Sequence, residues 1–405
     1  MMISVDKATQ IVISNSQYFG EEVIPFLKST QRVLKEPITA DRDFPPFDRV
    51  SMDGIAISYN AFKKGQRAFE IEGIQAAGST QISMTNSAHC IEVMTGAILP
   101  KNTDTVIRYE DISIQNNTAT VLIANVNKCQ NVHSKGKDGK KHTQLVAPNT
   151  IISAAEIGVL ATVGKVLVKV AKQPKVMVIS TGDELVSVAD SPLKHQIRRS
   201  NVFTIVSLLE RIKIPVETAH IKDDKLLLKE AVKNYLKQYD VLLFSGAVSK
   251  GKFDFLPEIL EELGVEKKFH RVAQRPGKPF WFGVSDSNKH PNNNNNTVVF
   301  GFPGNPVSTF VNCLVYFYPW YYKSLGLELK EETAILAKDV TFKPTLTYFL
   351  QVTLTSKFGH LVATPIDGNG SGDLVSLVHA NAFIELPANK VEFKSGEVFK
   401  IFRYR

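Results

Sequence analysis

Three short polar segments of this chain carry residue types that bind anions or metal ions, and each follows an apolar run that predicts a strand. They are TGDE (181–184), SGAVSKGKFD (245–254) and PGNP (303–306). Ligands of an open parallel sheet bind outside the carboxyl ends of its strands. If the three strands are parallel neighbours, the segments meet at one sheet edge, which is the first candidate for a site.

The segment PGNP predicts the start of a helix. Asn305 is a favoured N-cap residue, and Pro306 fits the first helical position, where its missing N–H costs nothing. The free amides at such a start attract phosphate or another oxyanion. A strand-to-helix turn that binds nothing has the same sequence, so this segment alone leaves both interpretations open.

The segment TGDE places two carboxylates beside a glycine. Asp183 and Glu184 offer the oxygen ligands that Mg²⁺ prefers, and Gly182 lets the backbone approach a ligand. Taken alone, the segment favours the other interpretation, in which each carboxylate only caps the next element of structure. TGDE therefore indicates either a pair of magnesium ligands or a structural turn.

The segment from 245 to 254 nearly matches the loop of a nucleoside triphosphatase. Gly246, Gly251 and Lys252 fit the pattern G-x-x-x-x-G-K-[ST]. Phe253 stands where that pattern needs Ser or Thr to bind Mg²⁺. The match is therefore incomplete at the residue that would bind the metal.

A second fault in the match is Pro257. A triphosphate loop begins its helix at the Gly-Lys pair, and Pro257 would then lie inside the first turns at a cost of about 3 kcal/mol. We expect the helix to start near Phe255 or Leu256 with Asp254 as its cap. The loop keeps groups for another anion, namely Ser245, Ser249 and Lys250 or Lys252.

Strands and helices alternate between residues 175 and 326. We expect strands at KVMVIST, PVETAHI, DVLLFSG and TVVFGFPG, and helices at NVFTIVSLLERI, DKLLLKEAVKNYLKQY, LPEILEELG and PVSTFVNCLVYFY. This alternation predicts a parallel sheet covered on both faces. The polar run HPNNNNNT (290–297) is expected to be irregular.

The rest of the chain has a different pattern. Residues 5–35 have the apolar spacing of two helices, and residues 52–126 predict short alternating strands. Ser153 and Glu156 form a capping box that opens another helix. After residue 326 the chain is β-rich, with enough length for a small barrel or sandwich.

Composition excludes several functional classes. The 405 residues are 43% hydrophobic and 22% charged, as in globular proteins. The net charge of +8 comes from 48 basic and 40 acidic residues that are intermixed, and no stacked aromatic pattern accompanies it, so nucleic-acid binding is not expected. The one densely basic run, KGKDGKKH (135–142), is expected to be a solvated loop tip.

Cysteine usage and the apolar segments predict a soluble cytoplasmic protein. The three cysteines are far apart and odd in number, which favours a reducing compartment. The N-terminus has no secretory pattern, and the apolar helix around 311–322 is too short to span a bilayer. We therefore expect no contact with a membrane.

Six ordered motifs resemble the molybdopterin molybdenumtransferase family, which includes bacterial MoeA and the gephyrin E domain. Besides the three segments above, they are PPFDRVSMDGIAIS (45–58), MTGAILPKNTDTVIRYED (94–111) and GNGSGDLVSLVHANAFIELP (368–387), with RPGKP (275–279) supporting them. The match spans nearly the whole chain.

The resemblance implies a fold class of α/β plus β in a multidomain elongated chain. The implied parts are a discontinuous helical and β platform for dimerisation (1–45 and 146–174), an inserted β-rich domain (46–145), a molybdopterin-binding domain with a central, open, mainly parallel sheet (175–326), and a small C-terminal β domain (327–405). It also implies a homodimer with its site in a cleft between subunits.

The resemblance further implies an activity. Members take adenylylated molybdopterin and molybdate, hydrolyse the pyrophosphate bond with Mg²⁺, and release AMP and molybdenum cofactor. A molybdopterin adenylyltransferase and molybdoenzyme apoproteins are the implied transient partners. The alternative within this family is a non-catalytic dimeric scaffold of the same fold.

The implied site residues fall into three groups. The catalytic candidates are Asp53, Asp183, Glu184, Asp254 and Lys278, and the first three of these are the candidate metal ligands. The candidate ligand-binding residues are Thr95, Gly96, Glu110, Asp138, Thr181, Gly182, Ser245, Gly246, Ser249, Arg275, Pro303, Gly304, Asn305, Ser308 and Ser371.

The sequence departs from the family pattern at four positions. Val50, His133, Ala247 and Gln351 stand where the family has Ser, Arg, Gly and often an anion-binding Arg. Loss of charge at His133 and Gln351 could weaken binding, and Arg198 or Arg199 could compensate. We expect a divergent but active enzyme.

Overall fold

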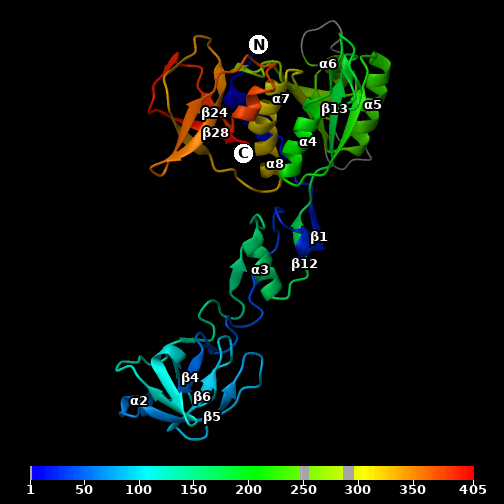
Figure 1. Cartoon of the computed structure of the whole chain (residues 1–405). Coiled ribbons are helices and arrows are strands. Elements are labelled where there is room, and N and C mark those ends of the chain that lie inside the picture. Colours follow the sequence, from blue (N-terminus) through cyan, green and yellow to red (C-terminus); the bar gives the residue numbers. More distant parts are fainter. Residues whose placement is uncertain (1, 247, 249–254, 286–295) are drawn as a thin grey trace. The chain divides into compact units, whose positions relative to one another are not determined.

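A computed structural model of the chain describes residues 2–246, 248, 255–285 and 296–405. The chain divides into two compact units (Figure 1). The larger unit comprises Met1–Val23, Gln31–Val33 and Lys169–Arg405, and the smaller unit comprises Ile24–Thr30 and Leu34–Val168. Each unit is described by itself.

The larger unit contains a six-stranded sheet. Its order is β16 (Val216–Ile221), β13 (Val176–Thr181), β17 (Val241–Ser245), β21 (Val298–Phe302), β20 (Trp281–Ser285) and β18 (Val265–His270). The first four strands are parallel, as the sequence predicts, and the last two are antiparallel. Beyond these four, the pair β18 and β20 was not predicted from the sequence.

Both faces of the sheet are buried at its four inner strands, which is why β13, β17, β21 and β20 are mostly apolar. Leu242 and Phe244 of β17 pack with α5 (Lys225–Gln238) and α6 (Leu256–Glu262). Leu243 packs on the opposite face with α4 (Asn201–Arg211) and the helices that follow β21. Figure 1 shows β13 between α4 and α5.

The helix after β21 runs from Pro306 to Ser324 in three parts. They are α7 (Pro306–Asn312), a π-helical segment (Cys313–Phe317) and α8 (Tyr318–Ser324). Pro319 lies in the first turn of α8 and cannot donate a helical hydrogen bond. The wider π-helical turn just before it accommodates the proline, so the helix continues instead of ending there.

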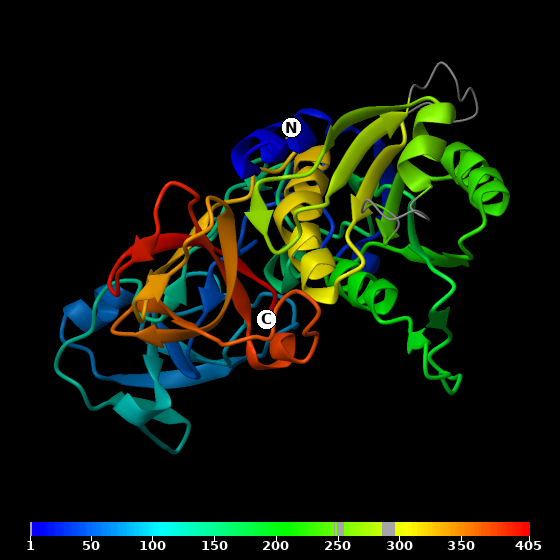
Figure 2. The same ribbon diagram turned by 90° about the horizontal axis from the view of Figure 1, so that it is seen from above.

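The C-terminal strands close into a barrel. Each strand pairs with the next in the order β24 (Thr347–Lys357), β25 (His360–Pro365), β22 (Glu332–Leu336), β28 (Val398–Arg403) and β26 (Ala382–Leu386). The last strand, β26, also pairs with β24, which closes the ring. Of the two predicted options, a barrel is therefore correct. The short strand β19 (Gln274–Arg275) also joins β24, in parallel. Figure 2 shows the barrel beside the helix after β21.

The smaller unit is β-rich. Its six-stranded sheet has the order β7 (Thr105–Arg108), β4 (Gly54–Ile57), β6 (His89–Val93), β5 (Ala68–Gln75), β9 (Thr118–Val121) and β8 (Ile112–Gln115). These strands match the predicted alternating runs. Two short pairs lie outside this sheet: β2 (Ile38–Thr39) with β11 (Gln144–Val146), and β3 (Arg49–Val50) with β10 (Val132–His133).

The helix predicted at residue 153 is confirmed, whereas only one of the two helices predicted in residues 5–35 is present. The helix α3 (Ala154–Thr162) begins with the predicted capping box of Ser153 and Glu156. Of the two helices expected in residues 5–35, only α1 (Val5–Ser14) forms. The second is wrong, because β1 (Glu21–Pro25) pairs with β12 (Leu167–Ala171) and Phe26–Lys28 is a single 3₁₀ turn. Pairing with a distant strand outweighs the local apolar spacing there.

No helix among the described residues is both long and apolar enough to cross a membrane. The nineteen-residue stretch that begins at Pro306 is broken into the three parts described above.

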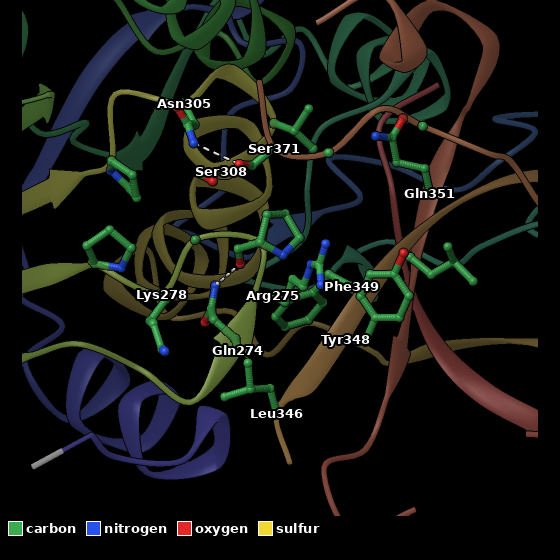
Figure 3. Close-up of a pocket in the computed structure, with 18 of the residues that line it drawn as sticks. Gln274, Arg275, Lys278, Asn305, Ser308, Leu346, Tyr348, Phe349, Gln351 and Ser371 are labelled. Atoms are coloured by element: carbon green, nitrogen blue, oxygen red, sulfur yellow. Dashed lines mark hydrogen bonds between the residues drawn. The ribbon is translucent and has the colours of Figure 1, made fainter. Parts of the chain in front are cut away.

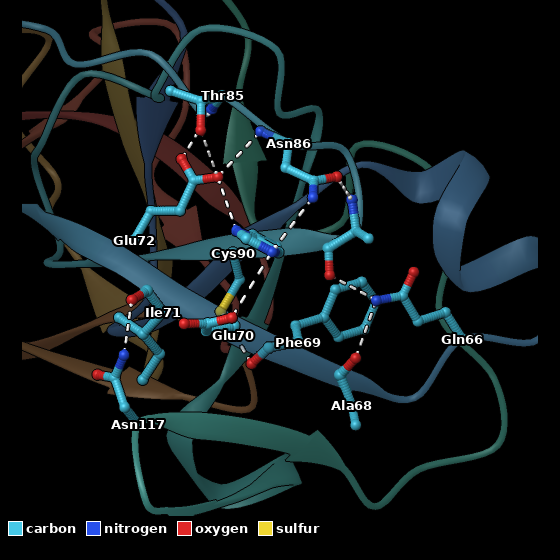
Figure 4. Close-up of polar contacts among 12 residues, drawn as sticks. Gln66, Ala68, Phe69, Glu70, Ile71, Glu72, Thr85, Asn86, Cys90 and Asn117 are labelled. Carbon is cyan, nitrogen blue, oxygen red and sulfur yellow. Dashed lines mark hydrogen bonds and ion pairs between the residues drawn. The ribbon is translucent and has the colours of Figure 1, made fainter.

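The loop between β5 and β6 is held by one carboxylate. Glu72 accepts hydrogen bonds from the Thr85 amide (2.7 Å), the Thr85 hydroxyl (2.8 Å), the Asn86 amide (2.9 Å) and His89 Nδ1 (2.9 Å), as Figure 4 shows. These bonds, the Thr85 amide first, lower the pKa of Glu72 from 4.5 to about 2. The carboxylate form is therefore the one that anchors the loop.

We predict that Glu72→Gln lowers the melting temperature at pH 7. A pKa lowered by folding stabilises the fold fully above pH 4.5, and this contribution is lost as pH falls toward 2. The difference between wild type and variant in thermal denaturation should therefore shrink steadily below pH 4.5. The matched control is Glu70→Gln, since Glu70 is exposed and lies 3.7 Å from His89. An equal loss in both variants would contradict the prediction.

Candidate active site

The three predicted turns meet at one edge of the sheet in the larger unit. Thr181, Ser245 and Phe302 end the neighbouring strands β13, β17 and β21. The Gly246 amide donates to the Phe302 carbonyl (3.0 Å), which joins the second turn to the third. The structure thus brings together the segments that begin at Thr181, Ser245 and Pro303.

Asn201 connects two of these turns and was missed by the sequence analysis. Its Nδ2 donates to Ser245 Oγ (2.9 Å) and to the Gly304 carbonyl (2.7 Å). Asn201 is the first residue of α4. A polar amide at the start of a predicted helix beside this edge was the available signal, but its two partners are 44 and 103 residues away in sequence.

The two acids of TGDE are exposed at the end of β13. Asp183 Oδ1 accepts a hydrogen bond from the Asp223 amide (3.3 Å). The Glu184 carboxylate folds back over Gly182, whose φ of +133° lies in the region that favours glycine. Neither acid caps a helix, which removes the capping interpretation for this turn.

A histidine that the sequence analysis did not single out lies beside these acids. His220 Nδ1 is 3.1 Å from Ser180 Oγ on the neighbouring strand. Burial and then the Arg199 guanidinium lower the pKa of His220, so the imidazole is neutral at pH 7. Arg199 Nε is buried and has no hydrogen-bond partner in the described part of the chain.

Magnesium needs hard oxygen ligands, and it commonly takes one or two carboxylates together with substrate phosphates. Asp183 and Glu184 fit this requirement, because they are adjacent, exposed and at the sheet edge. Among the described residues no group of three His, Cys, Asp or Glu side chains is arranged as a complete metal site. Asp53, the third candidate ligand, belongs to the smaller unit.

A cavity of about 380 Å³ lies between the loop 274–279, the start of α7 and the barrel. Figure 3 shows its lining side chains, which come from α7, β19, β24 and the loop around 368–371. The predicted residues that line it are Arg275, Lys278, Pro303, Asn305, Ser308 and Ser371. The barrel contributes residues that the sequence analysis missed, chiefly Leu346, Tyr348, Phe349 and Ile366.

The cavity has a cationic side. Arg275 and Lys278 are both exposed, and neither forms an ion pair within the described part of the chain. The Arg275 guanidinium lies 6.0 Å from the centre of the Phe342 ring, which stacks on Tyr348 at 4.3 Å. The two positive charges are therefore available to an anion in the cavity.

The loop that carries these cations rests on a buried hydrogen-bond network. Gln274 Nε2 donates to Asn312 Oδ1 (2.7 Å) and to the Pro276 carbonyl (2.9 Å). Gln274 Oε1 accepts from the Tyr316 hydroxyl, and Asn312 Nδ2 donates to the Gly277 carbonyl (3.3 Å). Gln274, Asn312 and Tyr316 are all fully buried. The helix after β21 thus fixes the loop between Arg275 and Lys278.

The start of α7 agrees with the prediction in its backbone and differs in one side chain. Asn305 is the N-cap residue and Pro306 follows at the start of the helix. The Asn305 side chain does not cap the helix, because its Nδ2 donates to Ser371 Oγ (2.7 Å). The Val307 amide also donates to the Ser371 carbonyl (3.1 Å). The 371 loop therefore covers the helix start on the side of Asn305.

Gln351 lies in the wall of the same cavity. Its Nε2 donates to Ser376 Oγ (2.9 Å), while its Oε1 is buried and has no hydrogen-bond partner among the described residues. An amide at this position brings no charge to the cavity. The cationic side thus consists of Arg275 and Lys278.

The smaller unit holds a second group of predicted residues. Asp53 Oδ1 accepts from the Thr95 amide (2.6 Å), and this bond lowers the pKa of Asp53. The Tyr109 amide donates to the Asp53 carbonyl (3.2 Å), and the neighbouring Glu110 is exposed. Gly96 follows Thr95 and donates to the Val50 carbonyl (2.9 Å). Asp53, Thr95, Gly96 and Glu110 therefore lie together.

Asp138 lies on the basic loop of the smaller unit. His133 Nε2 contacts Asp138 Oδ1 at 2.8 Å, and the Asp138 amide donates to the Phe44 carbonyl (2.9 Å).

Val50, one of the departures from the family pattern, is fully buried, so its side chain cannot contact a ligand. Ser51 beside it is exposed. The predicted residues Ser249 and Asp254, and the departure at Ala247, lie outside the described residues.

Family models match along almost all of the chain. "MoeA N-terminal region (domain I and II)" matches residues 3–164, "Probable molybdopterin binding domain" matches 177–321, and "MoeA C-terminal region (domain IV)" matches 333–403. The chain thus has the domains of a MoeA-type multidomain protein.

Proteins with similar sequences carry names of the same MoeA-type class. A molybdopterin molybdenumtransferase of Synechocystis sp. is 38% identical and covers 100% of both chains, and one of Bacillus subtilis is 30% identical over 100% of this chain and 94% of its own. Two crystal structures of MoeA from Pyrococcus horikoshii superpose on the whole chain, with TM-scores of 0.82 and 0.79 at 25% and 28% identity. The chain belongs to the molybdopterin molybdenumtransferase family, which confirms the resemblance seen in its motifs.

We predict that Asn312→Ala lowers the free energy of unfolding by about 1–3 kcal/mol, because it leaves buried polar groups of Gln274 and Gly277 without partners. The freed loop should also weaken the binding of an oxyanion, such as inorganic phosphate, beside Arg275 and Lys278. Urea denaturation and calorimetric titration measure the two effects. The control Asn369→Ala removes an exposed hydrogen bond to Asp373 and should change the free energy of unfolding by less than about 0.5 kcal/mol. Unchanged stability in Asn312→Ala would contradict the network's role.

Proposed function

We propose that this protein is a molybdopterin molybdenumtransferase, which inserts molybdate into adenylylated molybdopterin and releases AMP and molybdenum cofactor. Membership of the family supports this proposal. The observation that carries it is the cavity in which Arg275, Lys278, Asn305, Ser308 and Ser371 converge. These residues come from three separate segments, and a structural role alone does not require cations without partners there.

The cavity residues suit molybdate or a phosphate group. Arg275 offers a planar fork of N–H donors and Lys278 a point charge, and both attract an oxyanion. Ser308 lies in the first turn of α7 and lines the same cavity, so its hydroxyl can donate a third hydrogen bond. Aromatic and aliphatic side chains of the barrel, such as Tyr348 and Leu346, exclude water from one side. A low local dielectric strengthens each of these contacts.

Asp53, Asp183 and Glu184 are the residues that would hold Mg²⁺. The ion would neutralise charge that develops on the phosphate oxygens when the pyrophosphate bond breaks. The backbone hydrogen bond from Thr95 lowers the pKa of Asp53, so this bond favours the carboxylate form that a metal ion needs. Asp183 and Glu184 are exposed at the sheet edge, where a ligand that lies across the turns can reach them.

The remaining candidates form the proposed path for the pterin and the nucleotide. At the sheet edge the turns present backbone amides, small side chains and hydroxyls, which let a flat ligand approach closely. We include Thr181, Gly182, Ser245, Gly246, Ser249, Asp254, Pro303 and Gly304 from the larger unit, and Thr95, Gly96, Glu110 and Asp138 from the smaller unit.

We further propose a homodimer with the site in a cleft between subunits. The helix α3 is apolar, yet Leu160 is its only buried residue within one chain. Nearby in the smaller unit, Leu27 and Val166 are 71% and 68% exposed, and the Phe26 amide donates to the Val166 carbonyl. An apolar surface of this kind favours coverage by a second copy.

The proposed setting is the cytoplasm, where cysteines stay reduced. Cys90, Cys129 and Cys313 are all free thiols. We expect a molybdopterin adenylyltransferase to supply the substrate and molybdoenzyme apoproteins to receive the product, both through transient contacts.

We predict molybdate-dependent release of AMP when the protein is incubated with adenylylated molybdopterin and Mg²⁺. Lys278→Ala should reduce this rate by about 100-fold, since it removes one charge that stabilises an oxyanion. The control Lys101→Ala removes an exposed lysine outside the cavity and should act like wild type. If neither the wild type nor the control variant releases AMP, the proposed enzymatic activity is contradicted. The non-catalytic scaffold would then be the function of this fold.

We predict that the wild-type chain elutes with a mass of about 90 kDa, twice 45.0 kDa. The double variant Leu27→Asp, Val166→Asp should shift toward 45.0 kDa, because charges in an apolar interface lose hydration without gaining partners. Light scattering coupled to size-exclusion chromatography measures the mass. Phe358→Asp is the control, since Phe358 is fully exposed at the turn between β24 and β25. A variant that stays dimeric would place the interface elsewhere.

A further inference from the structure

A side-chain hydrogen bond spans β4, the strand that directly follows Asp53. In the sheet of the smaller unit β4 lies between β7 and β6, and Gly54 pairs with Arg108 on one side and Val93 on the other. Tyr109 directly follows β7, and its hydroxyl donates to Glu92 on β6. The two outer strands are thereby joined across the first residues of β4.

The same two strands hold Asp53 itself. The Thr95 amide, just after β6, donates to Asp53 Oδ1 (2.6 Å), and the Tyr109 amide, just after β7, donates to the Asp53 carbonyl (3.2 Å). The next residue, Gly54, is so close to β7 that a Cβ there would lie 1.9 Å from the Ile107 carbonyl oxygen. The direction of the Asp53 carboxylate therefore depends on where β6 and β7 end.

Tyr109 and Glu92 are both partly buried, which makes their hydrogen bond strong. Burial, and then the bond to Glu92, raise the pKa of Tyr109, so its hydroxyl keeps the proton at every physiological pH. A bond from a neutral hydroxyl to a carboxylate is short and about twice as strong as one between neutral groups. Without Tyr109, the Glu92 carboxylate would lose the only side-chain donor that the described residues give it.

We propose that Tyr109 and Glu92 are positioning residues that fix the turn Ser51–Gly54 and thereby aim the Asp53 carboxylate at the substrate. This inference rests on the proposed function, in which Asp53 is catalytic. Neither residue contacts the reacting atoms. Tyr109 acts twice on Asp53, directly through its amide and indirectly through the bond that ties β7 to β6.

The test uses full-length Tyr109→Phe, which removes the hydroxyl and keeps the backbone bond to Asp53. We expect kcat for AMP release to fall about tenfold with KM within about twofold, because displacing a catalytic group slows the chemical step more than binding. Hydrogen exchange followed by mass spectrometry should show faster exchange at residues 51–54 and at Thr95. Glu92→Leu should reproduce both effects, and Glu92→Gln, which keeps an acceptor oxygen, should restore wild-type values.

The matched control is Tyr239→Phe. Tyr239 is a buried tyrosine that also donates to a glutamate, Glu217 (2.8 Å), but it lies just before the amino end of β17, away from the candidate site. It should leave kcat unchanged. Equal losses of activity in the two variants, or a kcat near that of wild type in Tyr109→Phe, would overturn the proposal.

The exchange measurement separates failure of this inference from failure of the proposed function. If the wild-type protein releases no AMP, the proposed activity fails, while faster exchange at 51–54 in Tyr109→Phe and Glu92→Leu still supports the tie between the strands. If wild type is active and exchange at 51–54 does not change in either variant, Tyr109 and Glu92 do not position Asp53.

Discussion

The buried contact among Gln274, Asn312 and Tyr316 is the constraint on which the cavity depends. A buried amide that loses a partner costs free energy, so the three side chains must stay together. Asn312 and Tyr316 belong to the helix after β21, and Gln274 belongs to β19, which pairs with the barrel strand β24. One satisfied network therefore fixes the loop with Arg275 and Lys278 against both the helix and the barrel.

The positive and negative side chains of the proposed site lie on separate segments. The cations of the cavity have no carboxylate partners among the described residues, whereas the acids Asp183 and Glu184 lie on another turn of the same sheet edge. In the smaller unit, the Asp53 carboxylate accepts a hydrogen bond from the Thr95 amide, and this bond rather than a basic side chain lowers its pKa. Because these groups do not neutralise one another, they remain available to an anionic ligand and its metal ion.

Local patterns predicted much of this fold. The four parallel strands, α4, α5 and α6 were found because buried strands are continuously apolar and their helices have a regular apolar spacing. The antiparallel β18 was missed because its sequence VEKKFH is half charged, as an edge strand can be. The second N-terminal helix was wrong because residues 21–25 pair with a strand about 145 residues later in sequence, which no local window contains.

The sequence by itself determined the family, the motif segments and the acids within them, because motif residues must be present in order and at fixed spacing whatever surrounds them. Only the tertiary structure decided which of them share a cavity. Asn201 and Gln274 act on residues far along the chain, and Asn305 bonds Ser371 instead of capping its own helix. Packing between distant segments brings such partners together. The spacing of residues along the sequence does not indicate which distant side chains will form a hydrogen bond.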